Sequence, residues 1–205
     1  LGQLVGGGMG MPRFESAEVG NLELTWLIPL ALVGTVCGWL YFVSEHASEA
    51  LSHAIGERPV VKAMLAGLAL AICGTVLPYT MFAGETQADV LMETYLTIPA
   101  GVLIATGLVK AMLTPALINL GWRGGHFFPV IFSGVSLGYG LAILTGADPV
   151  FCVAVCTAST MGAVMRQPVM VVGLLLMCFP LKGIVCMIIA AAIAAGIPLP
   201  KPLRK

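Results

Sequence analysis

The stretch Gly124-Gly125-His126-Phe127-Phe128-Pro129 combines residue types that suit the binding of an anion. It precedes an uncharged apolar run from Val130 to Thr145. Proline is well placed at the first position of a helix, and the two glycines allow close approach of the backbone. The free N–H groups and the positive dipole end of such a helix attract anions. We therefore predict an anion site at residues 124–129, where an abrupt helix begins at Pro129.

Lys110 is the one basic residue inside a second apolar run, and it is the other candidate for chemistry. An ionisable group at membrane depth is a functional candidate by default. The long stem of a lysine also lets its ammonium reach the membrane interface. The sequence leaves both interpretations open: a charge beside the anion pathway, or a structural side chain.

The composition is that of a membrane protein. Of 205 residues, 59% are hydrophobic and 10% are charged, and the mean hydropathy is +0.99. A soluble domain carries about 25% charged residues. The apolar runs are long and continuous, which indicates an all-α integral protein, multi-pass in the cell membrane, rather than a barrel. Ten basic and ten acidic residues balance, and no basic block suggests a nucleic acid partner.

The apolar runs are unequal in length and end at proline or glycine. The first, Leu24 to Val43, is long enough to span and continues as an amphipathic extension to Ile55. Leu77-Pro78 to Gly84 is expected to be a break, and Gln87 and Asp89 a polar turn. Further helices are expected at residues 60–77, from about 90 to 97, and at 99–118, 129–145, 150–165, 169–179 and 181–197. Broken helices at depth are tolerated where they are buried or line a cavity, which favours a channel or a transporter.

Two groups of residues in the sequence are potential metal ligands. Glu45, His46, Glu49 and His53 lie on the amphipathic extension, where they indicate either a solvated helix end or the metal site of an intramembrane enzyme. The six cysteines form no CxxC pair and are predicted to be packing residues. We expect no cofactor, no metal and no enzymatic activity.

Gly125 to Pro129 resembles the GxFxP signature of the CLC family of chloride channels and transporters. Arg166-Gln167-Pro168 is similar to the Arg-x-Pro break of that family, and Leu77-Pro78 with Gly84 to its Leu-Pro break. Gly134 and Gly138 match small residues after GxFxP. The resemblance covers residues 22–197, in order, and it implies broken, tilted helices that form one half of an inverted-repeat fold.

The resemblance also implies roles and boundaries. The backbone amides of His126 and Phe127 would donate to a chloride ion, and Phe127 would lie beside the pore. Residues 1–23 would be a linker from a preceding repeat, 24–197 the second repeat, and 198–205 a basic tail. The chain is expected to be a piece of a longer protein, because the first-repeat motifs are missing from it. A homodimer would form through residues about 167–197.

The sequence is compatible with three functions. The leading hypothesis is transport of chloride, as a channel or as a proton-coupled exchanger, in contact with membrane lipid. Because the gating residues of the family belong to the other repeat, these 205 residues do not distinguish a channel from a proton-coupled exchanger. They also do not distinguish chloride from fluoride as the ion. The alternatives are a non-conducting half-repeat that depends on a partner, and the intramembrane metalloenzyme.

Overall fold

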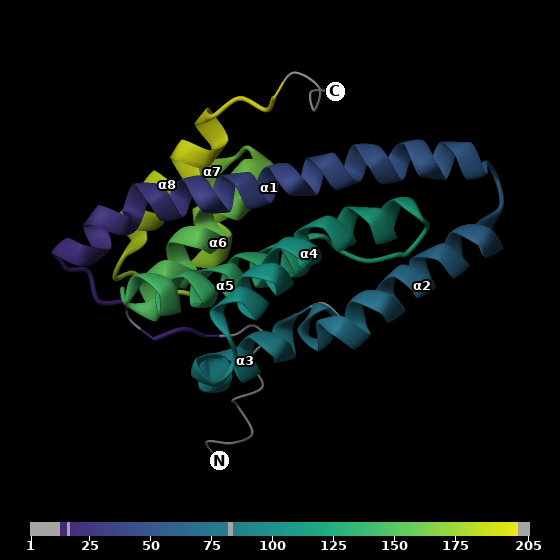
Figure 1. Cartoon of the computed structure of the whole chain (residues 1–205). Helices are drawn as coiled ribbons and strands as arrows, with labels where there is room; N and C mark the ends of the chain where they lie inside the picture. Colours follow the sequence, from purple (N-terminus) through teal and green to yellow (C-terminus); the bar gives the residue numbers. More distant parts are fainter. Residues whose placement is uncertain (1–12, 16, 82–83, 201–205) are drawn as a thin grey trace, which may run out of the picture.

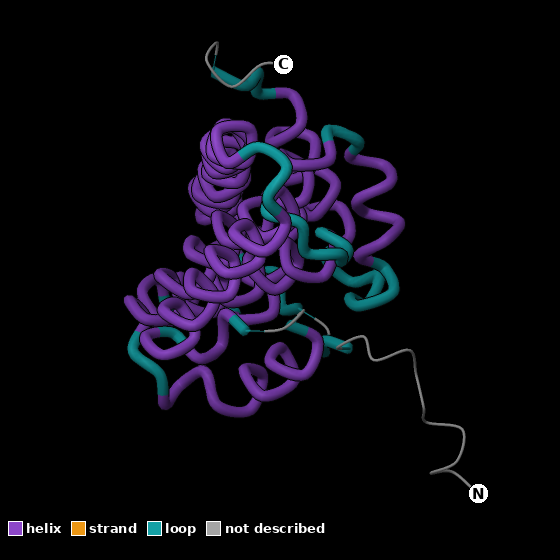
Figure 2. Tube along the Cα trace, turned by 90° about the vertical axis from the view of Figure 1, so that its right-hand side faces the viewer, coloured by secondary structure: helices purple, strands orange, loops and turns teal. Residues whose placement is uncertain are grey.

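The computed structural model describes residues 13–15, 17–81 and 84–200, and these form helices and connecting loops. The helices and 3₁₀ turns among them follow in the order α1 (Asn21–Ile55), α2 (Pro59–Val76), η1 (Pro78–Thr80), α3 (Glu85–Thr94), η2 (Tyr95–Thr97), α4 (Ala100–Asn119), α5 (Phe127–Thr145), α6 (Pro149–Met165), α7 (Pro168–Leu175) and α8 (Ile184–Gly196). Helix α1 runs along one edge of the molecule and α2 returns beneath it (Figure 1). Figure 2 shows the same helices from the side, with short loops between them.

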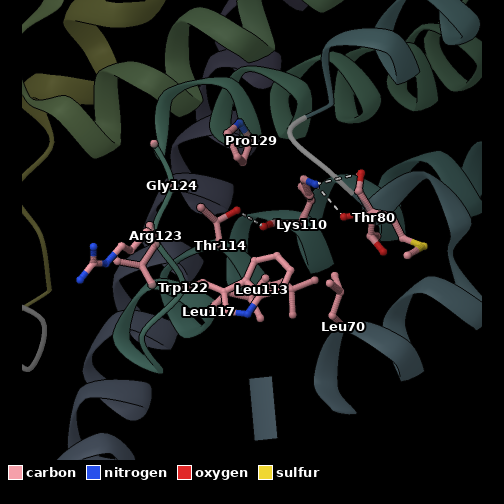
Figure 3. A pocket seen from close by; sticks show the side chains of 13 residues that line it. Leu70, Thr80, Lys110, Leu113, Thr114, Leu117, Trp122, Arg123, Gly124 and Pro129 are labelled. Carbon is pink, nitrogen blue, oxygen red and sulfur yellow. Dashed lines mark hydrogen bonds between the residues drawn. The ribbon is translucent and has the colours of Figure 1, made fainter. Parts of the chain in front are cut away.

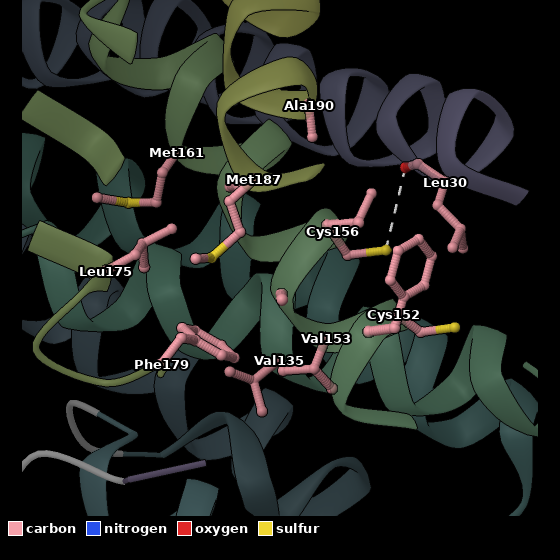
Figure 4. Close-up of a cluster of buried hydrophobic side chains, with 14 of the residues drawn as sticks. Leu30, Val135, Cys152, Val153, Cys156, Met161, Leu175, Phe179, Met187 and Ala190 are labelled. Atoms are coloured by element: carbon pink, nitrogen blue, oxygen red, sulfur yellow. Dashed lines mark hydrogen bonds between the residues drawn. The ribbon is translucent and has the colours of Figure 1, made fainter. Parts of the chain in front are cut away.

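Helix α6 is the most enclosed element, since every residue from Phe151 to Ala163 is buried. Helices α1, α5 and α8 pack directly against it. Their apolar side chains meet in one cluster, in which Leu30 of α1, Val135 of α5 and Met187 of α8 surround the side chains of α6 (Figure 4). The centre of the fold is therefore a helix that has no exposed side between Phe151 and Ala163.

Small residues set the spacing between these helices. A Cβ atom on Gly38 of α1 would lie 2.5 Å from the Cβ of Ala163. A Cβ on Gly138 of α5 would lie 2.7 Å from the backbone nitrogen of Val153. The backbones thus approach closely where two small residues stand four positions apart, at Gly34 and Gly38 of α1 and at Gly134 and Gly138 of α5.

Most predicted boundaries agree with the structure because local chemistry fixes them. Gly56, with φ 69°, ends α1, and Pro59 is the first residue of α2. Asp148 accepts a hydrogen bond from the N–H of Phe151 at 2.7 Å and so caps α6. Arg166, with φ 59°, ends the same helix.

Other boundaries differ. The polar turn predicted at Gln87 and Asp89 is wrong, because both residues lie inside α3. Ala88 and Leu91 of this helix are buried at i and i+3, so its polar residues occupy the outer face of a short amphipathic helix. Helices α7 and α8 are shorter than predicted: the first ends at Leu175 and the second begins at Ile184.

Four helices in the described part of the chain, α1, α2, α4 and α5, are long and apolar enough to cross a membrane. Helix α2 is the most exposed of them, with Ala66 as its buried residue. Its exposed side chains are apolar, among them Val60, Met64 and Val76. Such a surface suits lipid or further protein within a membrane, and it does not suit water.

The predicted linker is attached to the opposite end of the chain. The N–H of Phe14 donates to the carbonyl of Cys178 at 2.9 Å, and the ring of Phe14 stacks on that of Phe179 with centroids 4.4 Å apart. Helix α1 begins at Asn21, three residues before the first span was predicted to begin at Leu24. Residues 1–12 of the linker and residues 201–205 of the basic tail lie outside the described residues.

Candidate anion site

The N-terminus of α5 carries the predicted anion-binding stretch. The helix begins at Phe127, with His126 as its N-cap, so Pro129 is the third helical residue. The prediction that Pro129 opens the helix is wrong by two residues, because the first turn of a helix has no use for the N–H groups that proline lacks. Among the described residues, none accepts a hydrogen bond from the N–H of His126, Phe127 or Phe128. These donors and the positive end of α5 are available to an anion.

The side chains of this stretch point to other partners. The ring of His126 stacks on that of Phe127, with centroids 4.4 Å apart and an interplanar angle of 28°. Phe127 and Phe128 are half-buried and pack against the main apolar cluster. These contacts occupy the rings, whereas the N–H groups of the stretch have no partner among the described residues.

A cavity of about 250 Å³ lies beside this N-terminus. Three of the predicted residues, Gly124, Gly125 and Pro129, line it together with Lys110. Figure 3 shows Gly124 on one side of the cavity, Thr80 on the other and Lys110 between them. His126, Phe127 and Phe128 are not among the lining residues, which also include apolar side chains of α2 and α4.

Lys110 is buried, with 3% of its surface exposed. Its ammonium donates to the carbonyl of Thr80 at 2.6 Å and, more weakly, to that of Met81 at 3.4 Å. It also lies 5.9 Å from the centre of the Phe132 ring, within the range of a cation–π contact. The ammonium therefore binds backbone groups inside the protein, and the side chain also lines the cavity, so both interpretations that the sequence left open agree with its position.

The lining residues that sequence reasoning missed include Thr80, Met81 and Arg123. The proline-containing break at Leu77-Pro78 was a signal for the first two, since a broken helix inside a membrane exposes backbone groups that need partners. Arg123 directly precedes the two glycines, and its charge next to a candidate anion site was the signal for it.

The alternative metal site gains no support. In the part of the chain that the structure describes, no group of three His, Cys, Asp or Glu side chains is placed to hold a metal ion. The Nδ1 of His46 is 2.9 Å from the carbonyl oxygen of Phe42, one turn earlier in α1. The six cysteines are unpaired, and five of them are buried as packing residues.

A comparison with protein families relates this architecture to a known one. A family model described as "Voltage gated chloride channel" matches residues 3–198, nearly the whole chain. The chain belongs to this family. The CLC resemblance inferred from the sequence is thereby confirmed, as is the expectation of a multi-pass membrane protein that is not an enzyme.

A solved protein structure has the same fold as this chain. The structure described as "Crystal structure of a CLC-type fluoride/proton antiporter" matches with a TM-score of 0.77 and 21% sequence identity. The match covers 99% of this chain and 52% of the other, so the chain spans about half the length of that transporter. The predicted all-α membrane fold of the CLC type is confirmed. A comparison with curated proteins gave no match.

Proposed function

We propose that this chain forms part of a pathway for halide ions across a membrane, in which backbone N–H groups at the start of α5 hold the ion. The family and the half-length match to a transporter support a role in anion movement. The observation that carries the proposal is the unpaired N-terminus of α5 beside a cavity that also contains Lys110.

The chemistry of the site suits conduction. Neutral N–H donors and a helix dipole stabilise an anion without the strong binding of a full ring of cations, so the ion is able to leave again. Arg123, which lines the cavity, adds positive charge there. This charge favours anions over cations and raises their local concentration.

We propose chloride as the principal ion, on the basis of the family, and fluoride as the alternative, since the matched transporter is described as a fluoride/proton antiporter. The full-length protein in liposomes would be tested for efflux of either ion, with and without a proton uncoupler. Efflux that moves protons in the opposite direction indicates an exchanger, and efflux without them a channel. No efflux of either ion would refute the proposal and favour a non-conducting half-repeat.

Two substitutions at His126 test the role of the backbone. His126→Pro removes one N–H group of the site. The preceding residue, Gly125, tolerates a proline at position 126 because a glycine has no Cβ to clash with the proline ring. His126→Ala keeps that N–H and removes the imidazole. We expect His126→Pro to lower the apparent anion affinity by about tenfold, the loss of a charge-assisted hydrogen bond, and His126→Ala to change it by less than about threefold. A larger effect of His126→Ala than of His126→Pro would contradict backbone binding.

We further propose that residues 24–197 form the second of two membrane repeats, and that two copies of the protein associate through residues about 167–197. The chain's coverage of 52% of the matched transporter supports the first proposal. The second is supported by exposed apolar side chains on α7 and α8, which include Val169, Val185 and Ile188.

A further inference from the structure

The break between α2 and α3 interrupts the helical hydrogen bonding next to α4, a helix long and apolar enough to cross a membrane. The chain leaves α2 at Val76, makes one 3₁₀ turn at Pro78–Thr80, and begins α3 at Glu85. Among the described residues, Lys110 of α4 is the one donor to the carbonyls of Thr80 and Met81. Buried carbonyls without a donor are strongly unfavourable in a membrane. Lys110 therefore supplies the break with the hydrogen bonds that a continuous helix would have made.

The location of this contact connects it to the proposed pathway. Thr80, Met81 and Lys110 line the same cavity as Gly124 and Gly125, and Figure 3 shows the lysine between Thr80 and Gly124. An ion held at the start of α5 would thus have the break of α2 on the other side of the cavity. Carbonyl oxygens that face a pathway are ligands for cations and repel anions.

We propose that Lys110 is a positioning residue that determines ion specificity: by binding the carbonyls of Thr80 and Met81 it turns a cation-favouring wall of the cavity into one that admits an anion. This inference rests on the proposed function. It differs from a simple charge beside the pathway, because the lysine acts through the order and direction of the carbonyl groups.

The surroundings of Lys110 favour such a fixed role. Its stem is buried, and its ammonium is also placed over the ring of Phe132. The end of the break also packs against Phe132, because a Cβ on Gly84 would lie 2.5 Å from the Cβ of this residue. The lysine, the phenylalanine and the break thus pack as one unit at the edge of the cavity.

The test compares Lys110→Met, Lys110→Gln and Lys110→Arg in the full-length protein. Methionine has neither charge nor donors, glutamine has donors without charge, and arginine has both. Lys62→Met on α2, where the lysine does not line the cavity, controls for the loss of one positive charge. Two quantities are measured for each variant: the ratio of chloride to potassium permeability in liposomes, and hydrogen exchange at the Thr80 and Met81 amides.

We expect Lys110→Met to speed hydrogen exchange at the amides of Thr80 and Met81. It should also lower the ratio of chloride to potassium permeability by at least about tenfold, because the buried carbonyls of these residues lose their hydrogen-bond donor. Lys110→Arg is expected to stay within about threefold of the wild type in both measurements. For Lys110→Gln the permeability ratio should depend on the exchange rate. If the amides of Thr80 and Met81 still exchange slowly, the chloride selectivity should be kept although the positive charge is gone.

Two results would overturn the inference. One is a Lys110→Gln protein with slow exchange and lost selectivity, which would assign the effect to charge alone. The other is a Lys110→Met protein with normal selectivity. Failure of the proposed function gives a different result, because the wild type itself would then carry no chloride or fluoride.

Discussion

Replacing Gly107 by alanine should separate α4 from α5 and destabilise the protein. A Cβ atom at Gly107 would lie 2.7 Å from the backbone oxygen of Ser133, whereas ordinary contacts begin at 3.4 Å. The shortfall is about 0.7 Å (3.4 minus 2.7), and a backbone oxygen cannot rotate away as a flexible side chain could. The helices must therefore move apart at a site one turn before Lys110.

The size of the effect follows from two terms. Overpacking of a filled site costs about 1–3 kcal/mol. The hydroxyl of Ser133 donates to the carbonyl of Gly107, and displacing the helices loses this bond, at about 1 kcal/mol. Gly67→Ala on α2 is the matched control, because it makes the same exchange within a helix where a Cβ meets nothing within 4 Å. We expect Gly107→Ala to be about 2–4 kcal/mol less stable than Gly67→Ala.

The free energy of unfolding would be measured by denaturant titration in mixed micelles. Ser133→Ala separates the two terms, since it removes the hydrogen bond and leaves the oxygen that the new Cβ meets. It should cost about 1 kcal/mol and should not rescue Gly107→Ala in the double variant. If Gly107→Ala proves as stable as Gly67→Ala, the close packing of α4 on α5 described above is wrong.

Two further predictions concern a helix cap and an interface. Asp148→Ala removes the cap of α6 and should lower the free energy of unfolding by about 0.5–2 kcal/mol, while Asp148→Asn, which keeps an acceptor, should lose less than half of that amount. Val185→Phe places a larger side chain on an exposed position of α8, within the proposed dimer interface, and should weaken the dimer. Single-molecule photobleaching of labelled protein measures this effect as a smaller fraction of particles that carry two labels. The same change at Val76 of α2, also exposed, should leave that fraction unaltered, and equal loss at both positions would argue against association through α8.

The helices and most of their ends could be read from the sequence, because short-range chemistry decides them. A proline such as Pro59 or Pro149 suits the first position of a helix, and a glycine such as Gly56 suits its end. The same rules could not fix the start of α5, since Pro129 is acceptable anywhere in the first turn. They also failed at Asp89, where a polar composition concealed a short helix with one buried face.

The sequence by itself determined that this is a helical membrane protein, and it predicted that a helix begins within residues 124–129, where α5 starts at Phe127. Only the tertiary structure decided what the side chains do. The imidazole of His126 stacks on a neighbouring ring, and the ammonium of Lys110 reaches Thr80, a residue 30 positions earlier in the chain. Such contacts depend on which helices become neighbours. Apolar runs of similar composition contain no information about that choice, whereas the small residues at their crossings allow one close arrangement of the backbones.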